Sequence, residues 1–292
     1  YINPVYIDTV IADENDRDYL ISIIDKGHEN NLKIYPVCYI DDLADLSTKL
    51  PDHTSRLSVK IPVPEDVDGP SYENIFPLLK KFQSDNEVLL DIILDLNLII
   101  DKREANRQFK DAQEVLNNYL FNENFYNLII ISATSFPESL AAIPAGGKAS
   151  YYRFDFLIYE KLLEKFNSTN IKEKLIYSDY GVTKYTDSEI DFSILKYGIL
   201  PKVKYTLDNS YIVLKGERNQ KTRKLVKNYA ALAKEIIESD YYYGEDFSYG
   251  DQEIKERALG LNKKGPGSNT NWVTISANHH IVVVIEQLSK LV

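Results

Sequence analysis

Residues 89–96 read Leu-Leu-Asp-Ile-Ile-Leu-Asp-Leu, a short apolar run with two aspartates inside it. A run of this length, nearly continuous in apolar residues, is typical of a parallel β-strand that is covered on both faces. The longer segment from Val88 to Ile100 does not read as a membrane helix, because Asp91, Asp95 and Asn97 interrupt it. The stretch therefore predicts a buried strand in the middle of a sheet.

Similar runs recur along the first two thirds of the chain. Between them, apolar residues return at helical spacing around positions 19–24, 109–120, 156–166 and 225–236. Strands that alternate with helices at this spacing indicate parallel βαβ units. We predict seven strands: Val5–Thr9, Ile34–Ile40, Leu57–Val63, Leu89–Leu96, Leu128–Ala133, Leu175–Asp179 and Val203–Thr206.

Seven strands fall one short of a (β/α)8 TIM-like barrel, so we expect a first strand to be missing from the chain, which neither begins with nor contains methionine. The alternative is an open doubly wound sheet. No glycine-rich phosphate loop follows a strand, which weakens that alternative. We predict one barrel-like domain over residues 1–292, with an elaboration at about 207–292. It holds a hairpin, a helix from about Arg223 to Glu238, a long loop from Asp240 to Thr270 and a final helix.

Composition limits the classes of function. The net charge of −10 argues against a protein that coats nucleic acid by charge alone, although it leaves room for a local basic groove. The basic run from Arg218 to Lys227 is either a solvated helix start or such a contact. Cys38 is the single cysteine, so there is no intramolecular disulfide and no cysteine-based zinc site. The sequence shows no signal peptide or membrane helix, and we expect a soluble, cytoplasmic protein.

Two short motifs follow predicted strands, where barrel enzymes assemble their sites. Ser135 and Glu138 belong to the motif Ser-Phe-Pro-Glu, which could be a helix-capping box or a ligand site. Asp179 opens Asp-Tyr-Gly, and its carboxylate could be catalytic, bind a metal, or accept backbone N–H groups in a turn. Asp8 and Asp95 also end strands and are weaker candidates of the same kind.

Charged side chains in the second half offer further candidates. Lys204 and Lys215 lie on paired strands and could bind a phosphate or carboxylate, or be solvated lysines of a sheet edge. Asp246 and Asp251 flank a glycine-containing loop and could supply oxygen ligands to a divalent cation. Their spacing lacks the density of a calcium loop, so this metal reading is weak.

The C-terminal segment contributes the remaining candidates. Trp272 follows Gly-Pro-Gly, which is either a turn that seats the ring over the core or a loop that approaches a ligand. Asn278 suits an N-cap of the final helix. At such a position His279 and His280 would stay neutral and could act as general base or metal ligand, or be satisfied by backbone groups.

Taken in order, these motifs resemble the Beta protein family, a group found in phages and bacteria, from about Leu128 to Val292. Lys204 stands where arginine is expected and Tyr249 where tryptophan is expected. The family's distribution implies a role in phage–host conflict, and the resemblance implies no particular reaction. The residues that carry it are Ser135–Leu140, Asp179–Gly181, Lys204–Thr206, Lys215–Gly216, Asp246–Asp251, Gly265–Gly267, Trp272 and Asn278–His280.

Two functions remain open. In the first, a barrel binds or hydrolyses a phosphate-bearing or nucleotide-like ligand by acid/base or metal-assisted chemistry. In the second, the protein has no enzymatic activity and binds a partner protein or nucleic acid through Tyr241–Tyr243 and the basic run. In the first, the catalytic residues are Glu138, Asp179, His279 and His280, and the ligand-binding residues are Ser135, Lys204, Lys215, Asp246, Asp251, Trp272 and Asn278.

Overall fold

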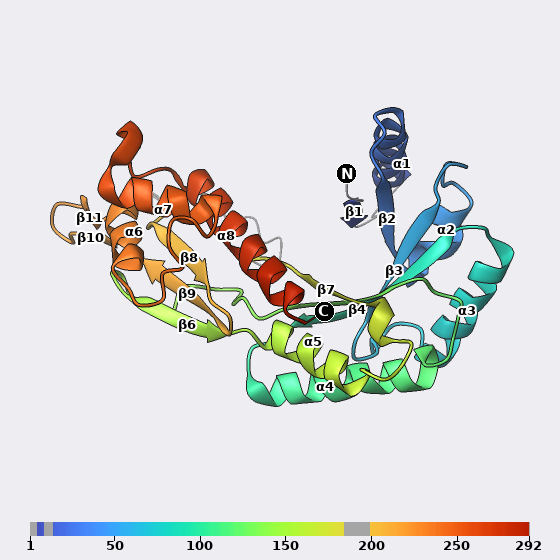
Figure 1. Cartoon of the computed structure of the whole chain (residues 1–292). Coiled ribbons are helices and arrows are strands. Elements are labelled where there is room, and N and C mark those ends of the chain that lie inside the picture. Colours follow the sequence, from blue (N-terminus) through green and yellow to red (C-terminus); the bar gives the residue numbers. More distant parts are fainter. Residues whose placement is uncertain (1–4, 9–13, 184–198, 292) are drawn as a thin grey trace. The chain divides into compact units, whose positions relative to one another are not determined.

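The computed structural model describes residues 5–8, 14–183 and 199–291 (Figure 1). Its contacts divide the chain into two compact units. The first comprises Tyr1–Asn97, Lys102–Ala133 and Ile158–Ser178, and the second comprises Leu98–Asp101, Thr134–Leu157 and Asp179–Val292. That the two behave as one domain stays a prediction.

A six-stranded sheet carries most of the first unit. Its order is β1-β2-β3-β4-β5-β7, and the pairs β1–β2, β2–β3 and β3–β4 are parallel. Leu90, Ile92 and Leu94 of β4 are fully buried, and Ile93 packs on the other face with Val37 and Ile130. The predicted central strand is therefore confirmed. The strands are β1 (Val5–Asp8), β2 (Ile34–Tyr39), β3 (Arg56–Pro62), β4 (Leu89–Leu98), β5 (Ile129–Thr134) and β7 (Leu175–Asp179).

Helices alternate with these strands, as the apolar spacing predicts. A π-helical turn, Leu116–Leu120, continues the fourth of them, and short 3-10 turns cover Ile40–Asp42 and Lys172–Lys174. The helices are α1 (Glu14–Glu29), α2 (Leu43–Ser47), α3 (Tyr72–Asp85), α4 (Lys102–Val115) and α5 (Phe154–Lys165). The mixed α/β class is thus confirmed.

The seventh predicted strand forms, but the prediction that it joins this parallel sheet is wrong. Val203–Thr206 lies in β8 (Lys202–Thr206), which pairs antiparallel with β9 (Ser210–Lys215). The latter pairs antiparallel with β6 (Lys148–Tyr152) in a separate three-stranded sheet. A tight turn over residues 207–209 can join only antiparallel strands, because a parallel pair needs a crossover. The predicted hairpin is therefore present, whereas the described residues do not confirm an eight-stranded ring.

Three helices lie against the three-stranded sheet (Figure 1): α6 (Tyr229–Ile237), α7 (Tyr249–Leu259) and α8 (Asn269–Ser289). The helix predicted from about Arg223 begins late, because Asn228 caps it by accepting the N–H of Ala231. The basic run before it forms a small ribbon instead of a helix start. In that ribbon β10 (Glu217–Arg218) pairs antiparallel with β11 (Leu225–Lys227).

The long loop predicted from Asp240 to Thr270 is also interrupted. Ser248 caps α7 by accepting the N–H of Asp251, and a 3-10 turn follows at Leu261–Lys263. Ser268 caps α8 in a capping box with Asn271. Because α8 begins at Asn269, Asn278 lies in its middle and the predicted N-cap is wrong.

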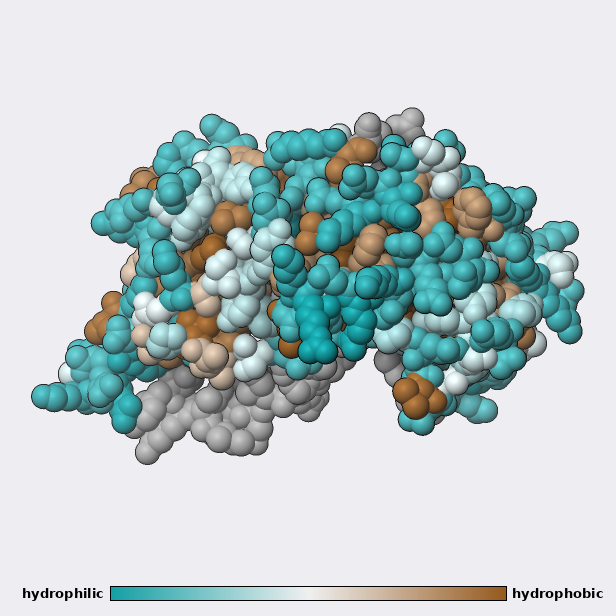
Figure 2. Space-filling view, turned by 90° about the horizontal axis from the view of Figure 1, so that it is seen from below, coloured by the Kyte–Doolittle hydropathy of each residue, from teal (hydrophilic) through white to brown (hydrophobic). Residues whose placement is uncertain are grey.

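The surface seen in Figure 2 is mainly hydrophilic, and its hydrophobic residues form separate patches. None of the helices in the described ranges combines the length and the apolar character that a membrane span requires.

Candidate functional site

Three side chains from separate elements form a chain of hydrogen bonds, which we call the His280 triad: Asp179, His280 and Thr206. Asp179 Oδ2, at the end of β7, lies 2.9 Å from His280 Nε2, and Thr206 Oγ1, at the end of β8, lies 3.1 Å from Nδ1. The ring is 3% exposed, and the carboxylate keeps 12% exposure. An ionised Asp179 can only accept a hydrogen bond, so it needs an N–H group at Nε2 of His280. A neutral ring with its proton at Nε2 then accepts a hydrogen bond from the Thr206 hydroxyl at Nδ1.

Asp179 is also held by the turn that follows it. Its Oδ1 accepts the N–H of Gly181 at 2.8 Å. Gly181 has φ of +65°, a left-handed conformation that glycine adopts without a steric penalty. The turn and the catalytic interpretations of Asp179 are therefore compatible, since one oxygen serves the turn and the other faces the imidazole.

Asp251, His279, Tyr205 and Ser248 form a second, deeper group, the His279 cluster. His279 Nδ1 lies 2.8 Å from Asp251 Oδ2, and Nε2 lies 2.8 Å from the Thr206 carbonyl oxygen. The Thr206 carbonyl oxygen can only accept, so Nε2 carries a proton and donates it to that hydrogen bond. Neutrality was predicted from a helix N-terminus, and that premise is wrong because His279 is inside α8.

Asp251 contacts each of the other three residues of the His279 cluster. It is fully buried, and it accepts hydrogen bonds from the Tyr205 hydroxyl at 2.7 Å and the Ser248 hydroxyl at 2.5 Å. Burial and the Asp251 charge raise the pKa of Tyr205. The Tyr205 ring stacks on His279 with centroids 3.9 Å apart. These contacts occupy both carboxylate oxygens of Asp251, as in a buried hydrogen-bond network that serves the fold.

The predicted cation loop does not gather its two carboxylates. Asp246 is exposed in the turn before α7, whereas Asp251 is buried inside the second unit. Within the described ranges, no three His, Cys, Asp or Glu side chains are grouped in a way that could hold a metal ion.

Lys204 lies beside the turn that carries Asp179. Its ammonium donates to the Val182 carbonyl at 2.5 Å and lies 4.9 Å from the Phe136 ring centroid. Burial, together with the positive charge of Lys202, lowers the pKa of Lys204 to about 8. A partly desolvated ammonium whose described acceptor is a neutral carbonyl is a suitable contact for an anion.

Ser135 and Glu138 do not begin a helix, so the predicted capping box is wrong. Ser135 is buried, and its hydroxyl accepts the N–H of Asp155 in the first turn of α5. It therefore stabilises the start of a helix that lies farther along the chain. Glu138 is exposed, and Lys215 holds the same loop by donating to the carbonyls of Leu140 and Ile143 at 3.4 and 2.7 Å.

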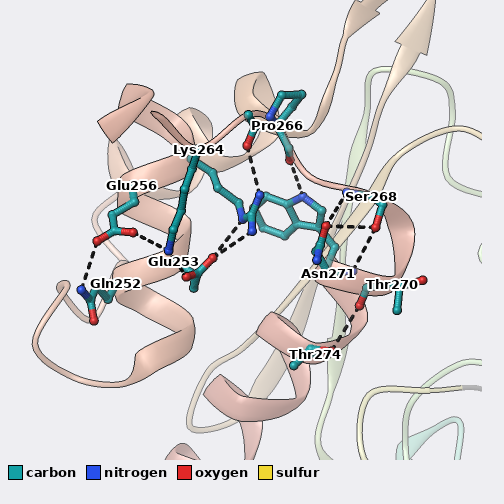
Figure 3. Close-up of polar contacts among 12 residues, drawn as sticks. Gln252, Glu253, Glu256, Lys264, Pro266, Ser268, Thr270, Asn271 and Thr274 are labelled. Atoms are coloured by element: carbon teal, nitrogen blue, oxygen red, sulfur yellow. Dashed lines mark hydrogen bonds and ion pairs between the residues drawn. The ribbon is translucent and has the colours of Figure 1, made fainter. Parts of the chain in front are cut away.

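The Gly265–Gly267 segment, whose Pro266 is labelled in Figure 3, contacts Trp272. The indole N–H donates to the Pro266 carbonyl at 2.8 Å, and the ring, 1% exposed in all, stacks on Tyr229. Lys264 bridges Glu253 and Glu256, so α7 anchors the segment. This geometry supports the core-seating interpretation of Trp272.

Asn278 fixes the crossing of α7 and α8. Its side-chain oxygen accepts the N–H of Gly250 at 2.7 Å. A Cβ at Gly250 would lie 2.6 Å from the Ile275 carbonyl, so only glycine permits this approach. The helices in turn bring His279 to Asp251.

Sequence reasoning missed Thr206 and Tyr205, although both belong to a quoted motif. Alternation along a strand places Lys204 and Thr206 on one face of β8 and Tyr205 on the other. The motif therefore supplies the His280 triad from one face and the His279 cluster from the other. That period-two pattern was the available signal.

The weaker candidates Asp8 and Asp95 meet in the first unit. Lys60 Nζ lies 2.9 Å from Asp8 Oδ2 and 3.3 Å from Asp95 Oδ2. Lys60 and Asp95 are buried, which fits an ion-pair group in the carboxyl-terminal halves of β1, β3 and β4.

The second unit thus brings together Asp179, Lys204, Asp251, Asn278, His279 and His280, and it uses Ser135, Lys215 and Trp272 in packing. No curated protein and no solved structure matches the chain significantly. The Beta protein family model matches residues 2–286, nearly the whole length. The chain therefore belongs to the Beta protein family.

Proposed function

We propose that this protein is a hydrolase-type enzyme for a phosphate-bearing, nucleotide-like ligand, with its reacting centre at Asp179. The observation that carries the proposal is the His280 triad, in which a buried imidazole links a partly exposed carboxylate to a buried hydroxyl. A carboxylate oriented by a histidine suits proton transfer from water. Asp179 is therefore the proton acceptor, and His280 is a positioning residue.

Lys204 contacts the anionic part of the ligand in this proposal. Its pKa of about 8 leaves it mostly protonated at neutral pH. Its single described hydrogen-bond acceptor is the Val182 carbonyl, and a phosphate oxygen is a stronger acceptor for an ammonium than a neutral carbonyl. Ligand binding then weakens as the pH rises through 8, because Lys204 loses its charge.

The test uses the whole chain and a series of nucleoside mono-, di- and triphosphates, with inorganic phosphate release as the readout. Asp179→Asn keeps the shape of the side chain and removes the proton acceptor, so we expect turnover to fall by about 100-fold or more. The melting temperature of the variant reports any structural damage separately. Unchanged turnover in Asp179→Asn, or no turnover of any nucleotide by the native chain, contradicts the proposal.

Binding is tested with the same nucleotides by titration calorimetry. We expect Lys204→Met to weaken binding by about 10-fold, the usual order for losing one charge-assisted hydrogen bond. Lys215→Met is the matched control, since that lysine also donates to carbonyls but lies on β9 beside the 140–143 loop. An equal loss of nucleotide affinity in both variants would mean that Lys204 affects binding only by stabilising the folded structure, without contacting the ligand.

A second candidate function, protein contact without catalysis, rests on an open hollow of about 500 Å³ beside Tyr241–Tyr243. The Tyr242 and Tyr243 hydroxyls already donate to the Asp251 carbonyl and the Asp208 carboxylate. Tyr241 is thus the residue to change. A partner captured by the native chain and lost on Tyr241→Ala, while Asp179→Asn still binds it, favours this function.

A further inference from the structure

The first half of α4 presents a basic face that no motif singled out. Lys102, Arg103, Asn106, Arg107 and Lys110 line a hollow of about 620 Å³. All five side chains are exposed. The chain as a whole carries −10, so this concentration of positive charge is local.

These cations are poorly explained by the helix itself. Among the described residues, Lys102, Arg103 and Lys110 form no ion pair with a carboxylate, and Arg107 has only a 3.3 Å contact with Glu104. Lys102 and Arg103 also lie in the first turn of α4, where positive charge opposes the helix dipole. The basic side chains therefore lower the stability of α4 slightly, and ion pairs with neighbouring carboxylates compensate little of that cost.

The spacing of the face suits a chain of phosphates. Residues 102–110 span about 12 Å along a helix that rises about 1.5 Å per residue. Each strand of duplex DNA carries one phosphate per about 3.4 Å of the helix axis. Four cations over that length match three to four consecutive phosphates, more than a single mononucleotide offers.

We propose that the basic face of α4 binds the phosphate backbone of nucleic acid without reading its sequence. Arginine and lysine dominate such contacts, and the face has no exposed aromatic ring on which a base could stack. Binding of this kind is local, and it does not conflict with the acidic balance of the chain. It is separate from the nucleotide site proposed at Asp179, which lies in the other unit.

The experiment measures fluorescence anisotropy of a labelled 20-base-pair duplex DNA across a salt series. We expect a Kd on the order of 10 µM at low salt and a slope of log K against log salt of about −3.6, as for roughly four neutralised phosphates of a duplex. Arg103→Glu with Arg107→Glu should weaken binding by at least about 10-fold and reduce the slope by about half. The melting temperature of the same variant is measured alongside, because the gain from Arg103→Glu near the helix N-terminus is opposed by its like-charge i,i+4 pair with Arg107→Glu and by the lost contact with Glu104.

The control is Lys172→Glu with Lys263→Glu, which makes the same change in net charge at two exposed lysines elsewhere. Its affinity for the DNA should fall by less than about 2-fold, since neither lysine lines the hollow of α4 and exposed charges outside the contact are screened by salt. An equal loss in control and test variants overturns the proposal, because it would reflect net charge alone. Polyglutamate binding as tightly as the DNA overturns it too, in favour of an acidic protein partner.

Discussion

Lys204 shows how one residue can be unfavourable for the fold and useful for function. Burial lowers its pKa from 10.5 to about 8, so the folded chain carries a penalty whenever the ammonium is charged. Residues kept against their own contribution to stability gather at functional sites. A stability measurement can therefore support the assignment of Lys204 without any knowledge of the substrate.

Lys204→Met should stabilise the protein at pH 7, and the gain should shrink at pH 9.5. The folded-state pKa of Lys204 lies below the unfolded one, so between pH 8 and 10.5 the unfolded chain binds more protons and native stability rises with pH. The shift sets an upper bound of about 3 kcal/mol, and the lost hydrogen bond to Val182 offsets about 1 kcal/mol of it.

Urea unfolding of both proteins at the two pH values measures this difference. Comparison with the native chain at each pH cancels the titration of the tyrosines. A gain that stays constant from pH 7 to 9.5 would show that Lys204 is solvated in the folded state.

At the scale of elements, the close packing of α7 against α8 at Gly250 holds the His279 cluster together. Gly250 has a backbone carbonyl and a backbone nitrogen within 3.0 Å of where its Cβ would lie, so no side chain can move aside to make room. We expect Gly250→Ala to destabilise the protein by about 1–3 kcal/mol, the usual range for overpacking. Chemical denaturation measures it.

Gly260→Ala is the comparison for Gly250→Ala. That glycine ends α7 with φ of +65° and has no atom within 4 Å of its Cβ position. It therefore reports backbone strain alone, about 1 kcal/mol for a left-handed alanine. Because Gly250 binds Asn278 and neighbours Asp251, only Gly250→Ala should also alter the His279 ring resonances in NMR spectra. Identical spectra for the two variants would contradict this role.

The sequence predicts elements that depend on local pattern and fails where distant residues decide. The apolar run in β4 and the spacing in α1 specify their own structure. His280 and Thr206 are 74 positions apart, so no local spacing reveals their contact. The predicted start of α8 at Asn278 is wrong because an asparagine can suit a cap on local grounds alone, whereas Ser268 and Asn271 form the capping box that begins the helix.

At the scale of the whole molecule, four elements cross the boundary between the two compact units. The last residues of β4, β5 and β7 and the first four of α5 belong to the second unit, and the rest of each belongs to the first. A strand or helix melts as a cooperative piece, so unfolding one unit must disturb elements of the other. This continuity supports the prediction of a single domain.

Calorimetry on two matched variants tests that prediction. Leu94 in β4 and Leu214 in β9 are both fully buried, one in each unit. Replacing either with alanine should cost about 2–5 kcal/mol. If the units unfold together, each variant shifts one and the same transition to lower temperature, and the calorimetric and van't Hoff enthalpies stay equal. If Leu94→Ala and Leu214→Ala instead split the trace into two transitions, each variant lowering a different one, the chain has two domains. The shared elements then fray at the boundary without coupling the two cores.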